Sequence, residues 1–259
     1  VCFRICTFNF LPPAPSSDPK YTGVRYISYN SDTNSLQFEY PADCTGGTDP
    51  PACEKNSDRP ENLKEFVVWG INKCKSNKKA GTTLKIALTL SSHGGGAIGT
   101  FGYDESVTGY TDGLSNDEIR VAITEVLAQF DDIEKLELLG FDACLMMSYA
   151  SAYEFKNLTN YYLASEATEP GHGWAYNEID WRPNRDAKSY AESVVTTFAQ
   201  SMHGSSSHQS PKTLAVIDMA SFPDFAQKFG ALADHLTAAL TSTNGDDVLL
   251  QRLVHARHQ

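Results

Sequence analysis

The stretches LKIALTL (residues 84–90) and LELLGF (residues 136–141) decide the fold. Each has the length and composition of a buried β-strand. The first runs into SSHGGG, which contains His93 and Gly94, and the second runs into Asp142-Ala143-Cys144. In an open α/β sheet, functional sites collect where parallel strands end. We therefore expect His93 and Cys144 to lie side by side at one edge of the sheet.

The rest of the chain supports an α/β fold. Strands that alternate with helices, and that are apolar throughout, indicate a mostly parallel sheet with both faces covered. We expect one domain over residues 1–259, with a long surface excursion at 30–60, where Pro, Asp, Asn and Gly occur without periodicity. The other predicted strands cover 1–10, 24–29, 161–164 and 214–217, and the predicted helices cover 61–75, 116–130, 145–156, 186–202 and 222–240.

Composition and charge exclude several classes of protein. The 259 residues include 21 Lys and Arg against 32 Asp and Glu, a net charge of −11. Nucleic-acid binding needs a basic footprint, so we expect none. No apolar run approaches the length of a membrane span. Six cysteines, whose pairing the sequence leaves open, favour a secreted protein.

The glycine turn after the first strand admits several interpretations. GGGAIG (residues 94–99) fits the dinucleotide fingerprint, but a loop follows it where that fingerprint requires a helix. HGGG (residues 93–96) resembles the oxyanion turn of lipases, but the chain has no G-x-S-x-G nucleophile elbow. A His/Cys metal site lacks the closely spaced ligand pairs of zinc motifs, so we expect no metal ligands.

A pairing of His93 with Cys144 explains the turn better. A thiol becomes a strong nucleophile as a thiolate, and a nearby imidazole can take its proton. We expect Cys144 at the start of a helix, where the dipole favours the thiolate. The backbone N–H groups of Gly94 and Cys144 are then placed to form an oxyanion hole.

At these residues the sequence resembles the clostripain-like cysteine peptidases, of the clan that holds caspases, legumains, gingipains and separase. The resemblance rests on the two strands that end in His-Gly and Ala-Cys, and on three further segments in family order. Those segments are DACLM (142–146), ASEA with PGHGWAY (164–167 and 170–176), and the helix that includes 63–69.

The resemblance implies a caspase-like α/β/α sandwich and cleavage of protein or peptide substrates after Arg or Lys, without a required cofactor. Some relatives use calcium for activation. Asp142 would lie in the S1 subsite, since a buried carboxylate binds guanidinium well. Ser165, Glu166 and His172 would also contact substrate, although His172 stands where relatives commonly carry an acid.

Two further expectations come from the same comparison. The family's first strand and helix are missing before Val1, so we expect a truncated or processed chain. Clan members are often zymogens that cut themselves, and Lys55 and Arg59 are the self-cleavage candidates. The alternative to an enzyme is a non-catalytic caspase-like fold that acts as a binding module. The intact pair of His93 and Cys144 favours the enzyme.

Overall fold

The computed structural model describes residues 7–9, 25–30, 35–41, 55–76, 78, 81–102, 113–171, 173–179, 186–201, 213–241 and 247–257. The chain divides into two compact units, residues 1–218 and 219–259. The first unit holds a four-stranded sheet in the order β4-β5-β6-β7, in which β7 alone runs antiparallel to its neighbour. The strands are β4 (Ala87–Ser91), β5 (Leu136–Asp142), β6 (Thr159–Ala164) and β7 (Ala215–Asp218).

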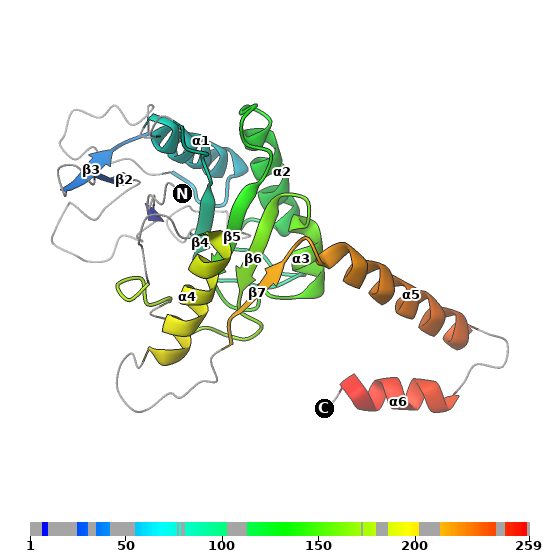
Figure 1. The fold of residues 1–259 in the computed structure, drawn as a ribbon. Coiled ribbons are helices and arrows are strands. Elements are labelled where there is room, and N and C mark those ends of the chain that lie inside the picture. The colour runs from blue at the N-terminus through cyan, green and yellow to red at the C-terminus, as the bar shows by residue number, and fades with distance from the viewer. Residues whose placement is uncertain are drawn as a thin grey trace. The chain divides into compact units, whose positions relative to one another are not determined.

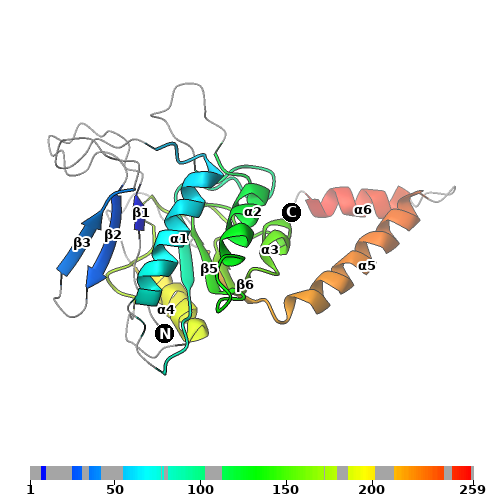
Figure 2. The same ribbon diagram turned by 90° about the horizontal axis from the view of Figure 1, so that it is seen from above.

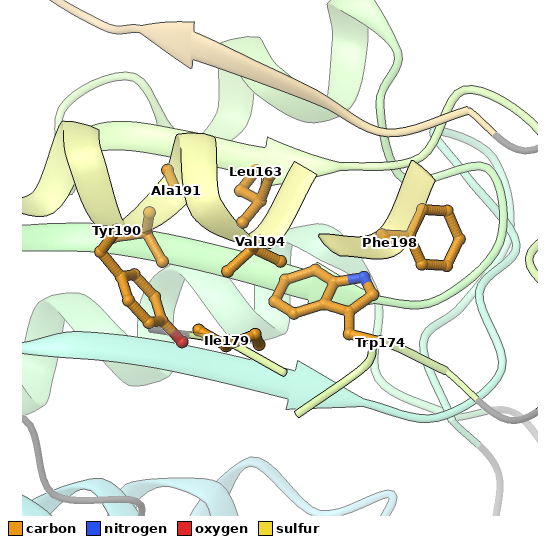
Figure 3. Packing of buried hydrophobic residues seen from close by; sticks show 8 residues of the cluster. Leu163, Trp174, Ile179, Tyr190, Ala191, Val194 and Phe198 are labelled. Atoms are coloured by element: carbon orange, nitrogen blue, oxygen red, sulfur yellow. The ribbon is translucent and has the colours of Figure 1, made fainter. Parts of the chain in front are cut away.

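Helices cover both faces of this sheet, because alternate residues of its buried strands point to opposite sides. Leu138 packs against helix α4 (Ala187–Gln200) on one face, in the cluster that Figure 3 shows. Phe141 points the other way and contacts Phe155 of α3 (Tyr149–Phe155), with ring centroids 5.4 Å apart. Helices α1 (Pro60–Ser76) and α2 (Asn116–Leu127) continue that second layer beside α3 (Figures 1 and 2). The expected mixed α/β sandwich with a mostly parallel sheet is confirmed.

The helix α2 forms where the apolar spacing and its first residues predict it. Ser115 is the N-cap: its side chain accepts from the Glu118 backbone N–H, and the Glu118 side chain accepts from the Ser115 N–H. This reciprocal capping box satisfies two donors that a helix start leaves open. Ile119, Ile123 and Val126 are fully buried on the inner face of the helix.

The N-terminal strands differ from the expectation, because they form a separate antiparallel sheet in the order β1-β2-β3. Its third strand lies in the 30–60 stretch that showed no periodicity. Tyr26 packs on Trp69 of α1 with ring centroids 4.8 Å apart, and Trp69 donates a 3.1 Å hydrogen bond to Glu39. Exposed positions dominate the third strand, so the pattern of a buried strand is missing there. The strands are β1 (Thr7–Asn9), β2 (Arg25–Asn30) and β3 (Ser35–Glu39).

The second unit consists of two helices, α5 (Phe222–Thr241) and α6 (Asp247–Arg257). Large apolar side chains are exposed on both, with Leu232 at 53% and Val248 at 55% of their full exposure. Among the described residues, no helix is both long and apolar enough to cross a membrane.

Candidate active site

The register of β4 and β5 brings together the two segments that follow these strands. Ser91 pairs with Asp142, and His93 and Cys144 each follow two residues later. Close contact continues past the strands: a Cβ atom on Gly94 would lie 2.2 Å from the Cys144 carbonyl oxygen. Only glycine lets the two backbones approach this closely. The structure therefore places His93-Gly94 directly against Cys144. This agrees with the prediction that the two segments lie side by side where the parallel strands end.

The glycine turn is held in place by its own backbone. The Gly102 N–H donates to the His93 carbonyl at 2.8 Å, and the Gly95 N–H donates to Thr100 at 2.9 Å. Within the described parts of the chain, the N–H groups of Gly94 and Cys144 donate to no carbonyl or side chain. Two free donors next to a candidate nucleophile are what an oxyanion hole requires. The His93 side chain is exposed.

The expectation that Cys144 starts a helix is wrong, and the thiolate argument from the helix dipole fails with it. Helix α3 begins at Tyr149, with Ser148 as its N-cap. Between them, Leu145 has a φ of 64°, a left-handed conformation that breaks a helix. The Leu145 N–H instead donates to the Ala167 carbonyl at 3.0 Å. The segment after Cys144 is thus hydrogen-bonded to the segment that follows β6.

The Cys144 sulfur faces the loop that follows β6. Cys144 is half-buried and forms no disulfide. The backbone N–H of Glu169 donates to Cys144 Sγ at 3.2 Å. This hydrogen bond holds the sulfur against the loop after β6. Cys74 is a buried free thiol, and the other four cysteines, Cys2, Cys6, Cys44 and Cys53, lie outside the described residues.

The carboxyl group of Asp142 is buried at the end of β5, on the α4 face of the sheet. Its Oδ2 atom accepts three hydrogen bonds: from Ser91 Oγ at 3.2 Å, from the Trp174 N–H at 3.2 Å and from Tyr176 Oη–H at 2.8 Å. Burial, followed by the negative charge of Asp142, raises the pKa of Tyr176. The Asp142 side chain therefore has a fixed orientation.

Two glycines let the 173–179 segment reach Asp142. Gly173 has a φ of 66°, and a Cβ atom there would lie 2.6 Å from Asp142 Oδ2. The Trp174 ring packs over Gly140, where a Cβ atom would lie 2.9 Å from the ring. Trp174 is 2% exposed and sits among the apolar side chains of α4 (Figure 3). This packing fixes the backbone that hydrogen-bonds Asp142.

Glu169 belongs to the same site, and the sequence reasoning did not single it out. Burial raises the pKa of Glu169 to about 9, and the adjacent Asp142 carboxyl adds to the shift. The buried oxygens Asp142 Oδ1, Glu169 Oε1 and Glu169 Oε2 have no hydrogen-bond donor. Glu169 directly precedes the Pro170-Gly171 turn of a segment already noted. The Pro-Gly turn marks this segment in the sequence, but the sequence could not show which acid faces Asp142.

The remaining predicted contacts lie in different surroundings. Ser165 is fully buried, and its hydroxyl donates to the Ala167 carbonyl at 2.9 Å and bonds to Thr213 Oγ1 at 2.9 Å. That side chain shapes the loop rather than facing solvent. Glu166 is exposed, and His172 lies outside the described residues.

The surroundings of Lys55 give no support to self-cleavage there, and metal ligands are a separate question. Among the residues that the structure describes, no three His, Cys, Asp or Glu side chains are grouped to hold a metal ion. Lys55 is 8% exposed and forms an ion pair with Glu65, so a protease reaches it poorly. Arg59 is exposed, but its carbonyl accepts from Asn62 at the start of α1.

Residues 48–253 match the model of the clostripain family. The chain belongs to this family of cysteine-type peptidases. A search of curated proteins found no match.

Solved structures share the clostripain-family fold with this chain. The secreted C11 cysteine protease "iotapain" from Bacteroides thetaiotaomicron is 16% identical, with a TM-score of 0.56 over 91% of this chain and 62% of that one. A secreted C11 protease from the same organism, in complex with an irreversible peptide inhibitor, is 18% identical, with a TM-score of 0.56 over 82% and 60%. An inactive zymogen C11 protease from Parabacteroides distasonis is 16% identical, with a TM-score of 0.52 over 86% and 54%. The chain thus spans less than two thirds of each.

Proposed function

We propose that the chain is a cysteine endopeptidase that hydrolyses peptide bonds after Arg or Lys through Cys144 and His93. The main observation behind the proposal is the contact between the segments that follow β4 and β5. Gly94 lies against the Cys144 carbonyl, and the free N–H groups of Gly94 and Cys144 lie beside a free thiol. Membership of the clostripain family supports the reaction class.

The proposed mechanism uses side chains and backbone of this chain alone. His93 takes the thiol proton, and Cys144 Sγ attacks the carbonyl carbon of the scissile bond. The oxygen of the tetrahedral intermediate receives hydrogen bonds from the Gly94 and Cys144 N–H groups. His93 returns the proton to the leaving amine, which departs and leaves an acyl-enzyme at Cys144. Water, deprotonated by His93, then hydrolyses the thioester.

The proposed basic preference rests on Asp142. Its buried carboxyl group is 4% exposed and keeps one oxygen, Oδ1, without a donor. A guanidinium or ammonium group supplies donors and an opposite charge, which a neutral side chain lacks. Ser165, Glu166 and His172 remain proposed substrate contacts, with Ser165 acting through the shape of its loop.

The proposed location and partners of the enzyme rest on its relatives and its charge. Two of the similar structures are secreted proteases, one of them with a peptide inhibitor bound, so we infer a secreted enzyme that acts on peptides or proteins. The net charge of −11 opposes nucleic-acid partners. The mechanism requires no cofactor, and calcium is proposed only as an activator.

Cleavage profiling with a peptide library tests the proposal. The wild type should cut after Arg and Lys, and Asp142→Ala should lose that preference while it still turns over other peptides. Cys144→Ala should turn over nothing. A wild type that binds peptides but never cuts them would favour the binding-module alternative. An unchanged profile in Asp142→Ala would remove Asp142 from the recognition of the substrate.

A further inference from the structure

The carboxyl groups of Asp142 and Glu169 form a buried pair in which most oxygens lack a hydrogen-bond donor. Three of their four oxygens have no donor, and the fourth, Asp142 Oδ2, is fully used by Ser91, Trp174 and Tyr176. A buried acceptor without a donor destabilises a fold. A proton held between the carboxyls, or a cation with several donors, satisfies such a pair.

Among the residues that the structure describes, no charged neighbour supplies that cation. Within the described ranges, no Lys, Arg or His forms an ion pair with Asp142 or Glu169. The titratable groups that face the pair are Tyr176 on the 173–179 segment, Tyr190 of α4 beyond it, and the Cys144 thiol. Burial raises the pKa of both tyrosines, so they stay neutral. The indole N–H of Trp174, which is buried without a hydrogen-bond partner, opposes the rise of the Glu169 pKa.

We propose that Glu169 is a specificity-determining residue, and that the cationic end of a substrate's Arg or Lys side chain binds between Asp142 and Glu169 in place of the proton they share. The inference rests on the proposed function. As the cation enters, the shared proton passes to solvent and both carboxylates become ionised. Glu169 is partly exposed and lies on a segment without regular secondary structure, so its side chain can move aside to admit the cation.

The position of Glu169 joins this pair to the nucleophile. Its side chain meets Asp142 while its backbone N–H holds Cys144 Sγ at 3.2 Å. A side chain bound at the carboxyl pair therefore brings its own backbone close to Cys144.

The experiment measures kcat/KM against pH for two peptides that differ only at P1, one with Arg and one with its neutral isostere citrulline. The ratio of the two values removes the pH dependence of the chemical steps, which both substrates share. For the wild type the Arg/citrulline ratio should rise with pH until about 9, by up to about tenfold per pH unit. In Glu169→Gln the ratio should be flat, and near pH 9 it should fall about 10- to 100-fold below wild type.

The variants separate the proposal from simpler explanations. Gln keeps a donor toward Asp142, as the protonated Glu169 does, so Glu169→Gln should fold. Glu178→Gln removes an exposed carboxyl from the neighbouring segment and should keep the wild-type ratio at every pH. If Glu169→Gln fails to fold, calorimetry of benzamidine binding to wild type in two buffers should still detect release of a proton near neutral pH.

Each outcome bears on one claim. A wild type that prefers Arg with a pH-independent ratio, or a Glu169→Gln variant with the wild-type profile, would overturn the role of Glu169 and leave the peptidase intact. Benzamidine binding without proton release would overturn it too. Absence of turnover for both peptides would overturn the proposed function itself.

Discussion

Glu169→Gln should change how stability depends on pH, even without substrate. Burial and the neighbouring Asp142 raise the pKa of Glu169 from 4.5 to about 9 in the folded chain. Between these values the folded state binds a proton that the unfolded state has released. The free energy of unfolding of the wild type should therefore fall as pH rises through this window, whereas Gln cannot titrate.

The size of the effect follows from the shift and the exposure. A fully buried group would contribute up to about 1.4 kcal/mol per pH unit, or about 4 kcal/mol between about pH 5 and about pH 8. Glu169 is only partly buried, and solvent screens its interaction with Asp142. We therefore expect the variant to gain about 1–2 kcal/mol over the wild type across this range.

Urea unfolding at several pH values, followed by tryptophan fluorescence, measures the difference between the two proteins. Glu178→Gln is the matched control, because its carboxyl is exposed and should follow the wild type at each pH. A difference between Glu169→Gln and wild type that stays constant with pH would refute the shared proton. So would a difference that grows as the pH falls.

Three further substitutions test the geometry of the site. Gly94→Ala should abolish turnover and destabilise the fold by about 1–3 kcal/mol, because its Cβ meets the Cys144 carbonyl at 2.2 Å; thermal unfolding and peptide hydrolysis check this. Gly173→Ala should weaken cleavage after Arg, because its Cβ meets Asp142 Oδ2 at 2.6 Å, whereas Gly171→Ala, with open space around it, should behave as wild type. Tyr176→Phe removes a 2.8 Å hydrogen bond to Asp142 and should raise KM for Arg substrates several-fold, by about 1 kcal/mol, with little change in kcat.

The central sheet was predictable because its strands carry a strong signal. Residues 136–141 are buried on both faces, so they read as an unbroken apolar run, and the register then placed His93 opposite Cys144. The third strand of the small sheet had no such signal, because positions 35–38 are exposed and only packing against α1 explains it.

The local structure around the nucleophile was harder to predict. The apolar pattern after Cys144 resembles a helix, but the left-handed Leu145 and the hydrogen bond from its N–H to Ala167 delay the helix to Tyr149. Those bonds come from a loop distant in sequence. The pairing of Glu169 with Asp142 has the same origin, since it depends on how the loop after β6 folds back over the end of β5.

Labelling with a peptidyl chloromethyl ketone that carries Arg or Lys at P1 tests the central claim most directly. Mass spectrometry should find one adduct, on Cys144 and not on Cys74, the other described free thiol. His93→Ala should slow the labelling strongly, and Cys144→Ala should abolish it. A wild type that takes up no label, or a label that persists in Cys144→Ala, would contradict the assignment of Cys144 as the nucleophile.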